Sequence, residues 1–358
     1  MMNEFSIIHP VNGDLLHAGD GILVQGALHY RVSIAATALA HITVNGKSAR
    51  HSEGIFTAYI ALDNYENTIE VSDENSGESL SITVYRLANF TGGYRLSIDD
   101  NIWFLQDLHA NENVYHSIFD NPYLAFMKLM HETYGTCVHF NLFYQTDGFN
   151  LSQLSDKFRA EWSAQAHWIR LSFHALQEKP DKPYQHAGYD TVKEDCEMVM
   201  KEIRRFAGDA LMGPVTTLHW GEANVEGCRA LRDAGYRGQL GYFNADDDEP
   251  AVSYYLNLEK RRHLKNRFIW KDIAENIVFI RTSIVLDCKK LDEIVPFLDQ
   301  YETNSNKPPF ADFLIHEQYY YPFYESYQQD YCLKIEKAIE CAVKNGYKPA
   351  FLGDSIFE

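Results

Sequence analysis

Two adjacent aspartates, Asp99 and Asp100, follow a stretch in which apolar and polar residues alternate. The alternation of Leu96 and Ile98 with polar neighbours indicates a β-strand, so both carboxylates should lie where that strand ends. Adjacent carboxylates repel one another, and a fold that presents both usually gives them different functions. One can bind a cation while the other, its pKa displaced by that charge, transfers protons. An acidic turn is the simpler interpretation of an isolated Asp-Asp pair. Residues further along the chain must therefore show whether this pair belongs to a functional site.

The composition argues against several classes of partner. The chain of 358 residues carries 50 acidic and 32 basic residues, a net charge of −18. Nucleic acids and anionic membranes are bound by basic surfaces, so we expect neither as a partner. The six cysteines show no paired spacing and are expected to be reduced thiols. The first residues lack the basic and apolar regions of a signal peptide, which predicts a cytoplasmic protein, or a secreted one if the sequence is trimmed.

A change in composition near residue 90 predicts two domains. All five tryptophans and all six cysteines lie after residue 100. Residues 1–90 contain short β-rich stretches, the Asn45-Gly46 hairpin signal and no helical pattern, which predicts an all-β sandwich. This region resembles the immunoglobulin-like accessory domains of bacterial carbohydrate enzymes, and the matching residues are Val44-Asn45-Gly46, Phe56, Ile60, Leu62, Asn67, Ile69 and Val71.

Residues 91–358 show strands that alternate with helices. Besides the strand of Leu96, strands are expected at 138–143, 169–173, 215–219, 240–243, 277–285 and 310–315. Helices are expected after an Asn121-Pro122 cap, after a capping box at Thr191, after Asn224 and from about residue 329. Such alternation predicts a parallel β/α barrel or a doubly wound sheet. Because no Gly-x-Gly-x-x-Gly or Walker-type loop supports nucleotide binding, we favour a distorted barrel of seven or eight strands. The acidic run at 246–249 is expected to be a solvated loop.

In a β/α barrel, the residues that follow each strand share the face that holds the active site. In this chain those positions carry three histidines and several carboxylates, which together favour a site over scattered structural residues. Trp103 and Trp220 beside them are expected to line the cleft. The aromatic run from Tyr319 to Tyr324 could stack on sugar rings, although packing of a long loop against the barrel would explain it equally well. These strand-end residues are Asp99 and Asp100 near Trp103, His174, His219 with Trp220 and Glu222, and His316 with Glu317 and Tyr319.

The order of these motifs over residues 93–350 resembles that of polysaccharide deacetylases, metal-dependent carbohydrate esterases on a distorted β/α barrel. The shared order is the Asp-Asp pair, a later His segment, His219-Trp220-Gly221 leading to Ala234-Gly235-Tyr236, and Leu314-Ile315-His316. The resemblance implies that Asp99 is the general base and His316 the general acid, with Asp100 and His174 as metal ligands. It also implies N- or O-deacetylation of a carbohydrate with a divalent cation, expected to be zinc.

Two positions depart from the family pattern. The second histidine of the metal motif is replaced by Glu178, which we expect to be the third ligand because a carboxylate oxygen can bind zinc. His186, His219 and Glu222 stay open as alternatives for that role. The arginine that steadies the base in the family is replaced by His219, so the substrate is expected to be shifted or turnover lost. We expect the substrate to be contacted by His219, Trp220, Glu222, Trp103 and Tyr319.

Two other functions stay open at this point. A glycoside hydrolase would use two carboxylates on different strand ends, for which Glu222 and Glu317 are the candidates. A carbohydrate-binding protein with a degenerate metal site would bind sugar without turnover. The three functions differ in their products. Release of acetate indicates a deacetylase, release of reducing sugar a glycoside hydrolase, and sugar binding without either product a binding protein. The sugar, the linkage, the acyl group and the oligomeric state are left open by the sequence.

Overall fold

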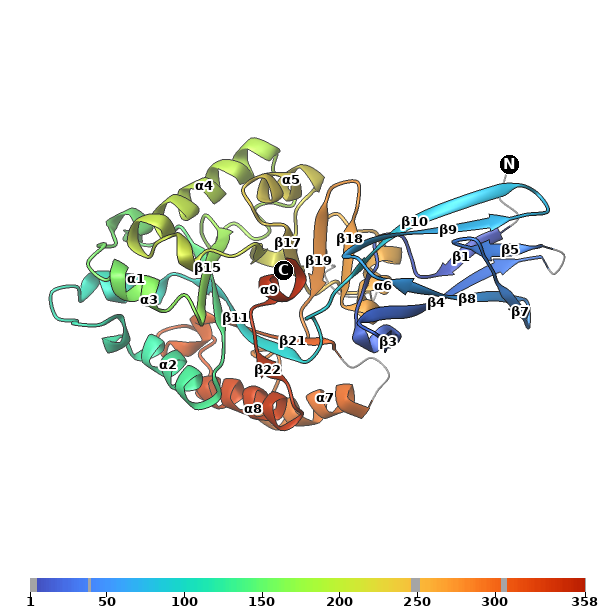
Figure 1. The fold of residues 1–358 in the computed structure, drawn as a ribbon. Helices are drawn as coiled ribbons and strands as arrows, with labels where there is room; N and C mark the ends of the chain where they lie inside the picture. The colour runs from blue at the N-terminus through green and yellow to red at the C-terminus, as the bar shows by residue number, and fades with distance from the viewer. Residues whose placement is uncertain (1–4, 38–39, 246–251, 304–307, 358) are drawn as a thin grey trace. The chain divides into compact units, whose positions relative to one another are not determined.

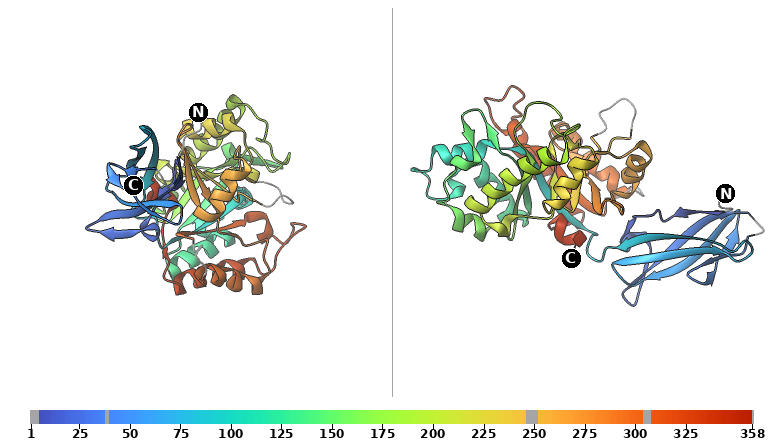
Figure 2. Two further views of the ribbon diagram at one scale, coloured as in Figure 1. Left: turned by 90° about the vertical axis from the view of Figure 1, so that its right-hand side faces the viewer. Right: turned by 90° about the horizontal axis from the view of Figure 1, so that it is seen from above.

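The computed structural model describes residues 5–37, 40–245, 252–303 and 308–357 (Figures 1 and 2). The chain divides into two compact units. The first comprises Met1–Thr91 with the short segment Ile269–Ala274, and the second comprises Gly92–Phe268 with Glu275–Glu358. Among the described residues, no helix has the length and apolar character needed to cross a membrane. The acidic run at 246–249 lies outside the described residues.

The first unit consists of two β-sheets, drawn in blue in Figure 2. Their apolar residues form one shared core, to which Val32 and Ile60 of one sheet and Ile69 and Val71 of the other contribute. The prediction of a β-rich, helix-poor N-terminal region is therefore confirmed, while its role as an accessory domain stays a prediction. One sheet contains β1 (Phe5–His9), β3 (Ile22–Val24), β4 (Ala27–Ala36), β7 (Arg50–Ser52) and β8 (Ile55–Leu62), and the other contains β2 (Leu15–Leu16), β5 (Ile42–Val44), β6 (Lys47–Ser48), β9 (Glu66–Asp73) and β10 (Glu78–Arg86).

Parallel strands form the centre of the second unit. One sheet has the order β15-β12-β11-β21-β20, and β22 pairs with the start of β11. A second group of parallel strands has the order β16-β17-β19. Their bounds are β11 (Gly93–Asn101), β12 (Val138–Phe143), β15 (Ile169–Ala175), β16 (Val215–Thr217), β17 (Gly238–Gly241), β19 (Ile277–Arg281), β20 (Ile284–Val285), β21 (Phe310–His316) and β22 (Lys348–Pro349). The parallel α/β region is thus confirmed, whereas a closed barrel is not shown, because the strands belong to two separate sheets.

Helices flank the strands on both sides, with α2, α7 and α8 along one side and α4 and α5 along the other (Figure 1). Asn121 caps α2 through its side chain and Pro122 is its first residue, as predicted. The predicted capping box at Thr191 is wrong, because α4 begins two residues earlier and Gly188 is its extended N-cap. The helices are α1 (Trp103–Ala110), α2 (Pro122–Tyr134), α3 (Arg159–Ala164), α4 (Tyr189–Phe206), α5 (Val225–Asp233), α6 (Leu258–Arg267), α7 (Leu291–Thr303), α8 (Tyr331–Lys344) and α9 (Leu352–Phe357), and the remaining short strands are β13 (Gln145–Thr146), β14 (Phe149–Asn150) and β18 (Ile269–Asp272).

The single strand expected at 277–285 is wrong, since the chain forms β19 and β20 in different sheets. Backbone pairing changes partner between them: the Thr282 N–H donates to Gly241, and the Ser283 N–H donates to Asp312 across to β21. Three polar residues, Arg281 to Ser283, stand at this change, but Thr282 and Ser283 are as buried as the apolar residues on either side. Periodicity therefore does not separate the two strands.

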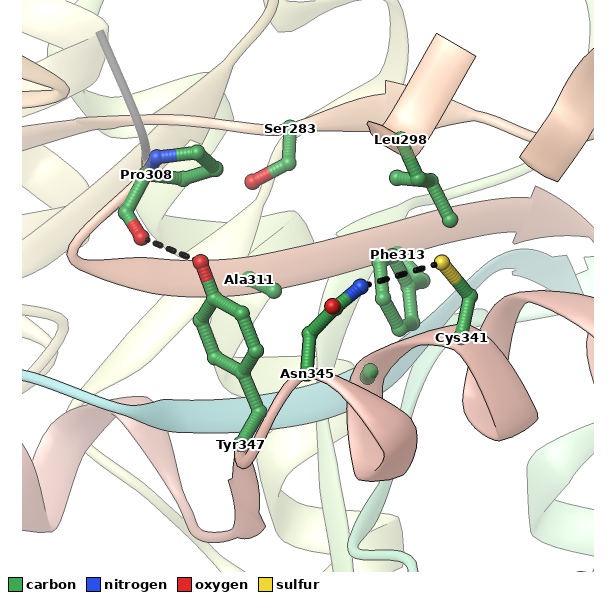
Figure 3. A pocket seen from close by; sticks show the side chains of 9 residues that line it. Ser283, Leu298, Pro308, Ala311, Phe313, Cys341, Asn345 and Tyr347 are labelled. Carbon is green, nitrogen blue, oxygen red and sulfur yellow. Dashed lines mark hydrogen bonds between the residues drawn. The ribbon is translucent and has the colours of Figure 1, made fainter. Parts of the chain in front are cut away.

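A small apolar cavity lies beside β21 and α8 (Figure 3). Tyr347 closes one side by donating a hydrogen bond to the Pro308 carbonyl at 2.8 Å. Its volume of about 20 Å³ holds no more than about one water molecule, so it is a packing defect rather than a ligand site.

Candidate active site

Most of the predicted strand-end residues line one large cavity of the second unit. Its volume is about 760 Å³, and Asp99 and Asp100 of β11 share its wall with His174 of β15, His219 and His316. Asp99 is the register partner of His316 on the adjacent strand β21. The rule that strand ends share one face thus collects these side chains even though a closed barrel is not shown.

Three buried side chains, Asp100, His174 and His219, form the group that could hold a metal ion. Asp100 Oδ1 lies 2.9 Å from His174 Nε2 and 3.0 Å from His219 Nδ1. The two ring nitrogens are 3.2 Å apart. One carboxylate oxygen and two imidazole nitrogens are a donor set that suits zinc and similar transition metals.

Backbone carbonyls orient both imidazoles for this role. His174 Nδ1 lies 2.5 Å from the Thr217 carbonyl, and His219 Nε2 lies 3.0 Å from the Glu178 carbonyl. A carbonyl only accepts, so these nitrogens carry protons and the opposite nitrogen of each ring faces Asp100. Metal-bound histidines are held in this way, with the second N–H on a carbonyl or carboxylate. The residues present therefore fit a divalent cation.

Electrostatics also favour a cation at this place. Burial alone would raise the pKa of Asp100, but hydrogen bonds from His174 and His219 hold it well below its usual range. Burial alone would lower the pKa of His174, but the charges of Asp99 and Asp100 outweigh burial and raise it. The triad thus holds an excess proton that a divalent cation would displace.

Glu178 lies outside this triad, although it lines the cavity. Its backbone carbonyl, rather than its carboxylate, contacts His219. The remaining oxygen of Asp100 accepts a hydrogen bond of 2.6 Å from Gln318 Nε2.

Asp99 has surroundings different from those of Asp100. Its Oδ1 accepts a hydrogen bond of 2.6 Å from Asn141 Nδ2, which comes from the middle of β12. Burial raises the pKa of Asp99, and the charges of His174 and His316 offset this only in part. The two adjacent carboxylates are therefore shifted in opposite directions, as expected when one binds charge and the other handles protons.

His316 is paired with a buried carboxylate. Asp287 Oδ1 lies 3.0 Å from His316 Nδ1 and accepts the His316 backbone N–H at 3.1 Å. Burial would lower the pKa of His316, but Asp287 outweighs it and, with Asp100 and Asp99, raises the pKa to about 10. The imidazole is thus protonated at neutral pH, and Nε2 is the nitrogen left to deliver a proton.

Two residues of the site have a left-handed backbone conformation. Asp100 has a φ of 61° and Trp220 a φ of 64°. Such conformations cost about 1–3 kcal/mol in a residue other than glycine and are concentrated at functional sites. One of these conformations is at Asp100 itself, and the other directly follows His219, so both are in or next to the triad.

The predicted substrate-contacting residues fall into two groups. Trp220 and Tyr319 line the large cavity, while Trp103 lines a second cavity of about 420 Å³ that shares Asp100, Glu178, Lys179 and Gln318 with the first. Trp103 packs against Phe323, whose side chain is 71% exposed. Glu222 is buried and lines neither cavity.

Glu317 is fully buried and is committed to the start of α1. Its carboxylate accepts the N–H groups of Ile102, Trp103 and Phe104 and the Tyr321 hydroxyl. Four donors occupy its oxygens, and it lines neither cavity. It therefore stabilises the helix that follows the Asp-Asp pair.

Among solved structures, the chain is similar to one described as "Crystal structure of putative polysaccharide deacetylase from Mycobacterium smegmatis". The match covers 74% of this chain and 90% of that chain, with a TM-score of 0.45 and 10% sequence identity. No protein-family model matches the chain, and no curated protein does. A likeness at this level of identity carries no information on substrate, metal or mechanism, so these must follow from the side chains.

Sequence reasoning missed three residues that contact the site: Asp287, Gln318 and Asn141. Asp287 follows β20, so the strand-end rule would have found it if the break after β19 had been recognised. Gln318 lies two residues beyond His316 on the same rim. Asn141 lies inside a strand, where the rule does not apply, and the signal for it is a polar residue within the buried run of β12.

Proposed function

We propose that this protein is a metal-dependent hydrolase that removes an acetyl group from a carbohydrate. The observation that carries the proposal is the Asp100, His174 and His219 triad, flanked by Asp99 on one strand and His316 on the next. A cation site, a carboxylate with a raised pKa and a protonated imidazole can supply the Lewis acid, the general base and the general acid of metal-assisted amide or ester hydrolysis.

A divalent cation at the triad, for which zinc is the expected metal, would polarise the acetyl carbonyl and acidify a water molecule. Asp99 then accepts the proton of the attacking water, because its carboxylate lines the same cavity and, among the described residues, Asn141 is the side chain that donates to its Oδ1. His316 donates a proton from Nε2 to the departing nitrogen or oxygen, and Asp287 stabilises the imidazolium before this step. Each general acid or base contributes about 10²–10⁴-fold to the rate.

The carbohydrate part of the proposal is supported by aromatic side chains that line the two cavities. Trp220, Tyr242 and Tyr319 line the large cavity, and Trp103 lines the second. Flat apolar faces with polar edges suit sugar rings, which have apolar faces and hydroxyl rims. Lys179 and Glu178, shared by both cavities, supply polar partners for hydroxyl groups.

The glycoside hydrolase alternative has little support from the positions of its two candidate carboxylates. Glu317 is held by four donors and Glu222 is buried outside both cavities, so neither is placed to act on a glycosidic bond.

The test uses the full-length protein stripped of metal with a chelator and reloaded with Zn²⁺, Co²⁺ or Mn²⁺. Penta-N-acetylchitopentaose and acetylated xylan are the probes, and acetate and reducing ends are both measured. We expect acetate from the reloaded protein alone, no new reducing ends, and loss of acetate release in His174→Ala. Reducing ends without acetate would support a glycosidase. Sugar binding without either product would support a binding protein, and both results would overturn the proposal.

A further inference from the structure

We infer that Asn141 is the residue that positions the Asp99 carboxylate, and that a one-way chain of buried hydrogen bonds from Arg95 fixes the orientation of the Asn141 amide. This inference rests on the proposed function of Asp99 as general base. Asn141 touches neither cavity, so it acts through Asp99 and not on the substrate.

The contact between Asn141 and Asp99 is short and buried. Asn141 Nδ2 lies 2.6 Å from Asp99 Oδ1, and both side chains are at most 2% exposed. Among the described residues, Asn141 is the side chain that donates a hydrogen bond to Asp99. A hydrogen bond to an ionised acceptor is about twice as strong as one between neutral groups. The bond therefore holds Asp99 in place as a carboxylate with one oxygen left for the reaction.

The amide of Asn141 is oriented by two donors on its other side. Asn141 Oδ1 accepts the Ser172 hydroxyl at 2.5 Å and the Thr217 backbone N–H at 3.3 Å. A flipped amide would place its NH₂ against the Thr217 N–H and its oxygen against the Asp99 carboxylate. Both contacts would be repulsive, so only one orientation is compatible with the surroundings.

Ser172 in turn is oriented by a histidine below it. His139 Nε2 lies 2.9 Å from Ser172 Oγ, and Arg95 Nη1 lies 2.6 Å from His139 Nδ1. Arginine has donors only, so His139 Nδ1 must accept and Nε2 must carry the ring proton. Burial, with the charges of Arg95 and Arg170, holds the pKa of His139 well below its usual range, in agreement with a neutral ring.

Arg95 anchors the far end of the chain. Its Nε donates to Asp312 Oδ1 at 2.6 Å, and Thr282 Oγ1 donates to the other oxygen of Asp312 at 2.7 Å. Each donor thus points toward Asp99, from a permanently charged guanidinium through His139, Ser172 and Asn141. Networks of this kind are rigid when every member is satisfied.

The first part of the test compares two buried serines. Ser172→Ala removes the hydroxyl that donates to Asn141, whereas Ser283→Ala removes a hydroxyl that accepts the Asp312 backbone N–H and donates to the Phe310 carbonyl. With penta-N-acetylchitopentaose and zinc-loaded protein, we expect kcat to fall about tenfold in Ser172→Ala, the equivalent of 1.4 kcal/mol, with KM unchanged. Ser283→Ala should keep the wild-type kcat. Equal effects in both variants would mean that the serine is merely structural.

The second part asks whether Asn141 acts through Asp99. Asn141→Leu keeps the volume and removes both polar atoms, and we expect about a 10²-fold fall in kcat from misplacement of the base. In an Asp99→Asn background the same change should have no further effect, because residues that act as one unit are not additive. A further fall of the same size would overturn the inference.

A third measurement does not depend on turnover. In protein labelled with ¹⁵N-asparagine, the Asn141 amide signals are assigned by their loss in Asn141→Leu. We expect these signals to move in Asp99→Asn and in Ser172→Ala, and to stay unchanged in Ser283→Ala. Asn141 amide signals that do not move in Asp99→Asn would refute the positioning role of Asn141 even if acetate is released. If the wild type releases no acetate, the proposed function fails, and this experiment still decides whether Asn141 holds Asp99.

Discussion

The pair formed by Asp287 and His316 allows a quantitative test of the proposed general acid. Replacing Asp287 by asparagine removes the negative charge beside the imidazole and keeps the volume of the side chain. Burial lowers the pKa of His316, and Asp287 is the largest of the charges that reverse this effect and raise the pKa to about 10. Without Asp287 the pKa of His316 must therefore fall.

The size of the fall follows from the geometry. Asp287 Oδ1 and His316 Nδ1 are 3.0 Å apart. Unit charges at that distance interact by about 5.5 kcal/mol in an effective dielectric of about 20, or about 4 pKa units. The asparagine side chain still accepts a hydrogen bond, and solvent replaces part of the stabilisation that the Asp287 charge gave. We therefore expect the pKa of His316 to fall by the 1–3 units typical of one opposite charge, or about 2 units.

The assay is the pH dependence of kcat for acetate release by zinc-loaded protein. His316 must be protonated to act as the acid, so activity is lost as pH rises through its pKa. We expect the alkaline limb of Asp287→Asn to lie about 1–3 units below that of the wild type. Asp181→Asn is the matched control, because Asp181 also lines the cavity but is exposed and pairs with Lys179. An unchanged alkaline limb, together with an unchanged ¹³C NMR titration of the His316 ring, would refute this account of the acid.

Three further predictions follow from the geometry of the site. His219→Ala should weaken zinc binding by more than about 100-fold, because loss of a residue that merely contacts a metal ligand already costs about 10–100-fold. Glu178→Gln should keep its full zinc content, measured by mass spectrometry. The reverse result would make Glu178 the third ligand. Glu317→Gln should lower the free energy of unfolding in urea by about 1–3 kcal/mol, because the new NH₂ faces backbone donors. Burial raises the pKa of Glu317 from 4.5 to about 7. Between these two pH values the folded state holds more protons than the unfolded state, so the stability of the wild type falls as pH rises from 4.5 to 7. The Glu317→Gln variant should lack this fall, and the same pH dependence in both proteins would contradict the raised pKa of Glu317. Trp103→Ala should raise KM for penta-N-acetylchitopentaose about 2- to 10-fold, as expected for one aromatic contact, with kcat unchanged; an unaltered KM would exclude sugar stacking.

Local patterns were sufficient to predict the Asp-Asp strand end. The alternation around Leu96 and Ile98 predicts the strand, although β11 is buried along its whole length, and the parallel pairing of β11 with β21 brings Asp99 to His316. Both features depend on short-range periodicity and on the rule that parallel strands end on one side. The same rule placed His174 correctly on the rim of the cavity.

Other features depend on tertiary structure and leave no local signal. The turn after β16 determines whether Glu178 or His219 contacts Asp100. In this turn Trp220 has a positive φ, which its residue type does not predict. Asp287 was hidden by the break between β19 and β20. A barrel closes only if each strand forms hydrogen bonds with a neighbour on both sides. The periodicity of residues within one strand does not show which neighbours it has.

The pairing of β11 with β21 also determines when the site can form during synthesis of the chain. Arg95 and Asp312 are 217 residues apart in sequence and form a buried ion pair. A nascent chain can fold its N-terminal sheets early, because those strands pair with near neighbours. The guanidinium of Arg95, in contrast, lacks Asp312 until β21 leaves the ribosome, and a buried charge without its partner is strongly destabilising. Assembly of the candidate site therefore waits until residues 310–316 have been synthesised, and the second unit stays incompletely folded until then.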